Sequence, residues 1–102
     1  MKIPSSLRPE IEAKIHAFNS KNDCKYAVRY RGKFLYLDRD DGHETLSPIC
    51  RLLFTGDMEK WEFAIYKYSS EVYDPEECFF PGVQHVDGTI EGAMMAGLEA
   101  YT

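Results

Sequence analysis

Four strand-like segments follow one another in this chain with no helical segment between them. Apolar and polar side chains alternate, or the run is short and apolar, in residues 24–30, 34–37, 49–55 and 61–68. A period of two is typical of β-strands, and the tight link Arg31-Gly32-Lys33 favours an antiparallel pair. Consecutive strands without crossover helices predict an antiparallel meander.

A helical segment stands at each end of this row of strands. Leu7, Ile11, Ile15 and Phe18 recur every three or four residues, as on the apolar stripe of an amphipathic helix. Residues 87–101 form a second helical segment. With 102 residues, the chain is long enough for one hydrophobic core. We therefore expect a single two-layer α+β domain, a four-stranded antiparallel meander flanked by an N-terminal and a C-terminal helix.

The last helix carries glycine at two interior positions, Gly92 and Gly97. Each glycine in a helix loses roughly 1 kcal/mol relative to alanine. Close approach of another backbone to a smooth surface would offset that loss. Because Gly92, Ala96 and Gly97 belong to one strip of small residues, we expect the strip to pack closely on the sheet or on a second copy of the chain.

The same segment, D-G-T-I-E-G-A-M-M-A-G-L-E-A-Y, resembles the glycine-bearing helix near the end of flavin amine oxidases. The resemblance implies a flavin diphosphate at the helix N-terminus. However, the chain has no G-x-G-x-x-G fingerprint, and Asp87 and Glu91 place negative charge where the phosphate would lie. His43, His85 and Cys78 also lack the spacing of metal ligands. We therefore expect neither a cofactor nor a metal.

The second half of the chain supports a broader resemblance. Residues 48–101, with P-I-C-R-L, W-E-F-A-I-Y and D-G-T-I-E-G-A, are similar to small bacterial domains of unknown function. This resemblance implies a compact α+β module. It brings no activity, substrate or functional residue with it.

Charge is distributed unevenly along the chain. Residues 1–37 hold eight Lys or Arg against three Asp or Glu, whereas residues 38–102 hold four against fourteen, and the net charge is −5. A negative domain is repelled by phosphate backbones, which disfavours general nucleic-acid binding, although a local basic face could survive in the first third. The alternative is that the two halves complement each other within the fold.

Three features bear on location. No apolar run approaches the roughly 20 residues that span a bilayer, and the opening Met-Lys-Ile-Pro-Ser-Ser does not have the pattern of a secretory signal. Cys24, Cys50 and Cys78 are odd in number and widely spaced, as suits reduced thiols. We expect a cytoplasmic protein without a membrane partner.

The first hairpin offers candidate contacts for nucleic acid. Four cations interleave with aromatic residues there: Lys25, Arg29, Arg31 and Lys33. Aromatic side chains on a strand can stack on bases while cations hold phosphates. By the period of two, however, Tyr26 and Tyr30 point away from Arg29 and Arg31, as in any amphipathic strand.

Several strands are apolar on both faces, which points to association. If both helices cover one face, the other presents Tyr36, Tyr66 and Tyr68, and exposed patches of this kind often mark interfaces. The leading hypothesis is a non-enzymatic interaction domain that binds another protein or a second copy, through this face or the small-residue strip. The alternative is that residues 71–86 cover the face.

The acidic stretch after the fourth strand suggests a second class of function. We expect residues 71–82 to be irregular, with Phe79 or Phe80 inserted as an anchor. A small-ligand or enzymatic site would involve Tyr73, Phe79, His85 and Asp87 in this region.

Overall fold

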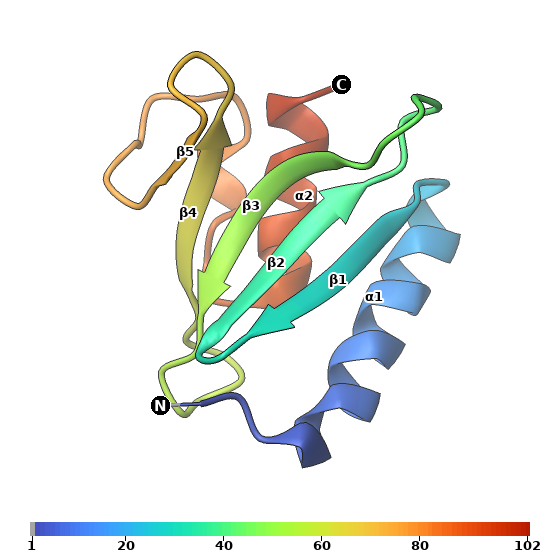
Figure 1. Ribbon diagram of the computed structural model, residues 1–102, viewed down its shortest axis with the longest axis vertical. Helices are drawn as coiled ribbons and strands as arrows, with labels where there is room; N and C mark the ends of the chain where they lie inside the picture. Colours follow the sequence, from blue (N-terminus) through green and yellow to red (C-terminus); the bar gives the residue numbers. More distant parts are fainter. Residues whose placement is uncertain (1) are drawn as a thin grey trace.

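The computed structural model describes residues 2–102 as a sheet with two helices on one face (Figure 1). The strands are antiparallel neighbours in chain order: β1 Tyr26–Arg31, β2 Phe34–Arg39, β3 Ser47–Leu53, β4 Glu62–Lys67 and β5 Val72–Asp74. The helices are α1 Arg8–Asn22 and α2 Ile90–Ala100, with short 3-10 turns at Ser5–Leu7 and Val83–His85. The predicted α+β class and antiparallel meander are confirmed. No helix within residues 2–102 is long and apolar enough to cross a membrane.

The sheet has five strands, so the prediction of four was one short. β5 pairs with the edge strand β4 where an irregular stretch was expected. The turn between them is closed by Glu71, which has a positive φ of 57° and whose N–H donates to the Lys67 carbonyl at 2.7 Å. Glycine and asparagine are the usual residues at positive φ. Because a glutamate takes that conformation here, the sequence carries no turn signal before β5. The strand itself has only three residues, too few to show a period of two.

A β-bulge changes which side chains of β3 face the core. The register between β2 and β3 shifts at Leu37 and Asp38, opposite Ile49. Consecutive residues of a regular strand face opposite sides of the sheet, which predicts opposite faces for Ile49 and Cys50, yet both are fully buried. The polar run of residues 38–43 predicts a loop, yet Asp38 and Arg39 belong to β2 and are only 5% and 4% exposed.

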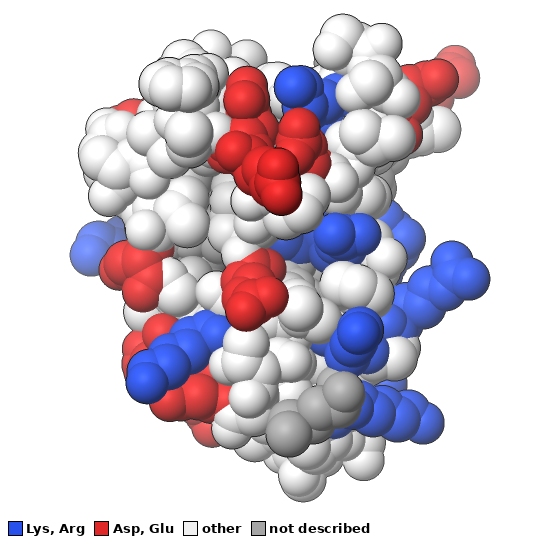
Figure 2. Space-filling model, turned by 90° about the vertical axis from the view of Figure 1, so that its left-hand side faces the viewer, with Lys and Arg blue, Asp and Glu red and all other residues white. Residues whose placement is uncertain are grey.

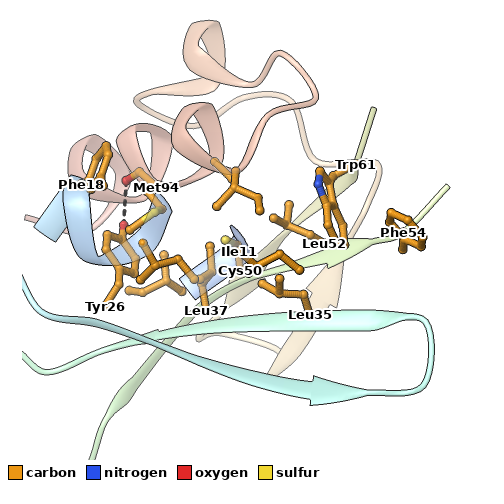
Figure 3. Packing of buried hydrophobic residues seen from close by; sticks show 14 of the residues in the cluster. Ile11, Phe18, Tyr26, Leu35, Leu37, Cys50, Leu52, Phe54, Trp61 and Met94 are labelled. Atoms are coloured by element: carbon orange, nitrogen blue, oxygen red, sulfur yellow. Dashed lines mark hydrogen bonds between the residues drawn. The ribbon is translucent and has the colours of Figure 1, made fainter. Parts of the chain in front are cut away.

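The core lies between the sheet and the two helices (Figure 3). Ile11 of α1, Met94 of α2 and Leu35, Leu37 and Leu52 of the sheet are almost completely buried. At full burial, each such side chain contributes about 1.5 to 3 kcal/mol. The apolar stripe of the first helix therefore has the role that its spacing predicts.

The small-residue strip of α2 contacts the sheet of its own chain. A Cβ on Gly97 would lie 2.5 Å from Ile49 Cγ2 and even nearer the Tyr26 hydroxyl. That hydroxyl donates to the Met94 carbonyl at 2.7 Å (Figure 3). Ala96 is buried as well. The strip was expected to pack on the sheet or on a second copy of the chain. Its buried residues, Ala96 and Gly97, pack on the sheet.

A buried arginine holds the C-terminus of α2. The Arg39 guanidinium donates to the carbonyls of Gly97 and Tyr101 and forms an ion pair with Asp41, Nε to Oδ1, at 2.7 Å. The last carbonyls of a helix lack partners within the helix and carry partial negative charge. Arg39 therefore joins the end of α2 to the end of β2.

Candidate interaction surface

The face of the sheet opposite the helices is the candidate site. In Figure 1 α2 lies behind the sheet and α1 lies beside β1, and no helix or strand of residues 2–102 crosses the face turned toward the viewer. We call this face the outer face. Cross-strand pairs place Arg29, Tyr36 and Arg51 side by side on it, and Tyr66 opposite Tyr73. We define the aromatic–arginine surface as Arg29, Phe34, Tyr36, Arg51, Tyr66, Tyr68 and Tyr73.

The aromatic rings of this surface form one connected group. Tyr73 lies at its centre, with its ring centroid 5.2 Å from that of Tyr36 and 5.0 Å from that of Tyr66. Tyr68 continues the group 4.9 Å beyond Tyr66. These pairs are edge-to-face, which is a favourable arrangement of aromatic quadrupoles. The group therefore spans β2, β4 and β5 as a preformed patch.

The position of Arg29 is fixed by a buried carboxylate. Its Nε donates to Asp38 Oδ2 at 2.5 Å and its Nη2 to Oδ1 at 3.1 Å, a bidentate pair. The hydrogen bond with Asp38 raises the pKa of Arg29. The guanidinium carbon also lies 4.8 Å from the centre of the Tyr36 ring. Arg29 is therefore an ordered cap on Tyr36, and its charge is compensated within the chain.

Arg51 is placed differently, because it has no carboxylate partner among residues 2–102. Its guanidinium carbon lies 4.5 Å from the centre of the Phe34 ring and 5.6 Å from that of Tyr73. Rings hold a cation in this way by attraction to their faces, but they leave the N–H donors of the guanidinium available. Arg51 therefore presents an uncompensated charge, ready to bind a carboxylate or phosphate.

The rim of the surface is held to neighbouring segments. The Tyr68 hydroxyl donates to the Pro48 carbonyl at 2.7 Å, and the Tyr101 hydroxyl donates to the Tyr66 carbonyl. Burial raises the pKa of Tyr68, Tyr73 and Tyr101. The three phenols are therefore neutral at physiological pH, so the charge of the surface comes from its arginines.

Acidic residues gather at the neighbouring edge. Figure 2 looks at the edge formed by β4, β5 and the segment that follows, where red side chains group in the upper half. Several blue side chains project along the right-hand margin, on the side of the outer face. Around β5, the chain carries Glu71 before the strand, Asp74 at its end, and Glu76 and Glu77 after it. Positive and negative surfaces therefore lie on adjacent sides of the molecule.

The candidate nucleic-acid contacts are only partly brought together. Arg29 and Arg31 lie on the outer face, and Lys33 lies in the β1–β2 turn with its amine 5.7 Å from the centre of the Phe34 ring. Lys25 precedes β1 and is exposed. As the period of two predicted, Tyr26 is turned to the helix side. The aromatic neighbours of these cations therefore come from other strands.

The candidate ligand residues are dispersed over three places. Tyr73 belongs to the outer face and Phe79 is 89% exposed on the following loop. His85 and Asp87 do line a common groove of about 740 Å³ between α1 and the start of α2. Gly92 borders the same groove, unlike the buried part of the strip.

His85 and Asp87 are both engaged in structural bonds at this groove. His85 Nε2 lies 3.0 Å from Glu99 Oε1. The Asp87 carboxylate accepts from the hydroxyl and N–H of Thr89, which lowers the pKa of Asp87. Thr89 in turn caps α2 by accepting from Gly92 N–H at 2.9 Å. Asp87 therefore serves the start of a helix.

Arg51 was not identified from the sequence, and Tyr73 was expected in a ligand site instead of at the centre of the ring group. A signal was present for Arg51, since a lone arginine interrupts the apolar run I-C-R-L-L. A charge there implies that one face of the strand is open. Tyr73 gave no comparable signal, because its position depends on β5.

Two further observations concern metal ligands and related proteins. Among residues 2–102, no three His, Cys, Asp or Glu side chains come together as a metal site. Comparison with known protein families, curated proteins and solved structures finds no match for this chain.

Proposed function

We propose that this chain is a non-enzymatic self-association module and that the outer face of its sheet is the contact surface. One observation carries the proposal: a connected group of aromatic residues, with Arg51 among them, lies on a face that no helix or strand of the described residues, 2–102, crosses. Interfaces are enriched in tyrosine, phenylalanine and arginine relative to other surfaces.

The order of the surface supports association. Rings held by their neighbours, and an Arg29 fixed by two hydrogen bonds, have already lost most of their conformational freedom. Ordering side chains on binding costs about 0.5 to 1.5 kcal/mol each. A preformed surface avoids much of that cost.

Tyrosine ring resonances provide the test. NMR spectra recorded from about 20 μM to about 1 mM cover the range in which weak contacts form. We expect the rings of Tyr36, Tyr66 and Tyr73 to shift with concentration. Tyr26, which is buried under α2, is the matched control and should not shift. A monomeric mass by light scattering and unchanged rings throughout would overturn the proposal.

Single-stranded nucleic acid is the second candidate, because Arg31 and Lys33 lie close to Phe34 on the outer face. Against it, the guanidiniums of Arg29 and Arg51 lie over rings on which a base would stack. The acidic edge and the net charge of −5 would also repel phosphates. Anisotropy of a labelled oligothymidine, measured at low and physiological salt, tests this candidate; binding that is lost in Arg31→Ala would establish it.

A further inference from the structure

Phe79 is the most exposed large apolar side chain in residues 2–102, at 89%. Its neighbour Phe80 stacks on Phe63, with ring centroids 5.8 Å apart, and so fixes the loop. The two phenylalanines therefore have different roles. Phe80 holds the loop to the chain, and Phe79 is left on a fixed backbone with no contact that explains it.

The loop cannot turn back onto the outer face of its own chain. Phe63 is paired with the buried Leu52 and points to the helix side of the sheet. Further on, Gly82 has a φ of 98°, and a Cβ there would lie 2.6 Å from the Ala96 carbonyl oxygen. The loop is thus held on the helix side at both points. A loop that covers the outer face must therefore come from another molecule.

The chemistry of the loop complements that of the outer face. Glu76 and Glu77 precede Phe79 and carry negative charge, while Arg51 offers uncompensated donors beside aromatic rings. Arg–carboxylate pairs can be bidentate, and a phenylalanine can pack edge-to-face on tyrosine. One segment therefore carries both groups that the aromatic–arginine surface binds.

We infer that the acidic loop, residues 75–80, of one copy docks on the outer face of a second copy. Phe79 packs on the rings of Tyr36 and Tyr73, and a carboxylate of Glu76 or Glu77 binds Arg51. This inference rests on the proposed self-association and names the surface that meets the outer face.

Such a contact joins two different surfaces of the same chain. Contacts of this kind are heterologous, and they produce rings or open chains according to the rotation between copies. A single loop also buries less area than a standard interface. We therefore expect weak association that increases steadily with concentration.

Two variants separate the partners of this contact. Phe79→Ser removes the anchor of the loop, and Arg51→Ala removes the cation of the outer face. Each should weaken self-association at least about tenfold, as for a central contact residue. Leu46→Ser, at an apolar side chain that is 46% exposed, and Lys60→Ala, at an exposed cation, are the matched controls and should associate like the unaltered chain.

Mixing the two variants gives the decisive measurement. In an equimolar mixture, the contact can form in only one way, between the intact outer face of Phe79→Ser and the intact loop of Arg51→Ala. Sedimentation velocity should show heterodimers and nothing larger, while each variant alone is monomeric. Circular dichroism of each variant confirms folding, and Glu77→Lys provides a second loop variant if Phe79→Ser is poorly soluble.

The outcomes distinguish this inference from the proposed function. If Phe79→Ser associates as well as the unaltered chain while the outer-face tyrosines still shift with concentration, self-association stands and the loop is not the occupant. If the unaltered chain is monomeric throughout, both fail. If it is monomeric but an oligothymidine shifts the same tyrosines, the occupant is nucleic acid and the inference is overturned.

Discussion

Gly97 marks the closest approach of α2 to the sheet, so one added methyl group there tests the packing of the two layers. A Cβ would lie 2.5 Å from Ile49 Cγ2 and nearer still to the Tyr26 hydroxyl. Carbon atoms in contact prefer about 3.5 to 4.0 Å. Gly97→Ala must therefore move α2 by about 1 Å from the sheet, and this movement also breaks the hydrogen bond of Tyr26 with Met94.

The expected change in the free energy of unfolding of Gly97→Ala is the sum of opposing effects. Alanine gains about 1 kcal/mol over glycine in a helix interior. Overpacking a core costs about 1 to 3 kcal/mol, and a buried hydroxyl without its partner costs about 1 to 3 more. Since both costs arise at Gly97, we expect the free energy of unfolding to fall by about 1 to 5 kcal/mol in Gly97→Ala.

Urea unfolding followed by the fluorescence of Trp61, the single tryptophan, measures this change. The midpoint should fall at unchanged m value. Ser20→Ala, at an exposed position of α1, reports helix propensity alone and should not lower it.

A double variant tests the mechanism. Tyr26→Phe removes the oxygen that the new methyl group would meet. In the Tyr26→Phe background, Gly97→Ala should therefore lower the free energy of unfolding by a smaller amount. A coupling of this kind is expected only for neighbours. Equal costs in both backgrounds, or a raised midpoint in Gly97→Ala alone, would refute the packing argument.

Three further predictions concern stability. Arg39→Met should lower the free energy of unfolding by about 2 kcal/mol, because the last carbonyls of α2 lose a charged donor; Arg39→Lys should recover part of it in thermal unfolding. Burial and the Glu12 hydrogen bond raise the pKa of Tyr30 to about 12. Its contribution is therefore complete below the unfolded pKa of about 10 and lost as the pH rises toward the folded value, so urea titrations should show falling stability at alkaline pH and a shallower fall in Tyr30→Phe. Phe80→Ala should cost about 1 to 2 kcal/mol and Phe79→Ala less than about 0.5 kcal/mol by the same assay, since only Phe80 packs on the sheet.

Much of the fold could be predicted from local patterns. The apolar stripe of α1 and the period of two in β1 are properties of neighbouring residues, and they located these elements to within a few residues. The bulge at Ile49 could not be predicted, because it depends on how two strands meet. β5 was missed for the same reason: three residues become a strand only when β4 offers its edge.

The candidate surface follows the same division. Tyr36, Tyr66 and Tyr68 were expected on the second face from alternation alone, and they lie in the ring group of that face. The contacts of Arg51 with rings from β2 and β5 require the register of the whole sheet. Local sequence therefore indicates which face a side chain occupies, whereas its partners on that face depend on long-range pairing.

The charge asymmetry of the sequence is not neutralised by ion pairs within the fold. Of the four ion pairs between Lys or Arg and Asp or Glu in residues 2–102, only Lys14–Glu91 and Arg29–Asp38 join the basic first third to the acidic remainder. Arg31 and Lys33 are exposed and have no carboxylate partner among the residues that the structure describes.

Exposed charges of opposite sign on adjacent sides of one molecule attract a second copy, and salt screens that attraction over about 8 to 10 Å. Association measured by light scattering should therefore weaken as sodium chloride is raised. An association that strengthens with salt would instead indicate an apolar contact alone, in which Arg51 and the acidic loop have no part.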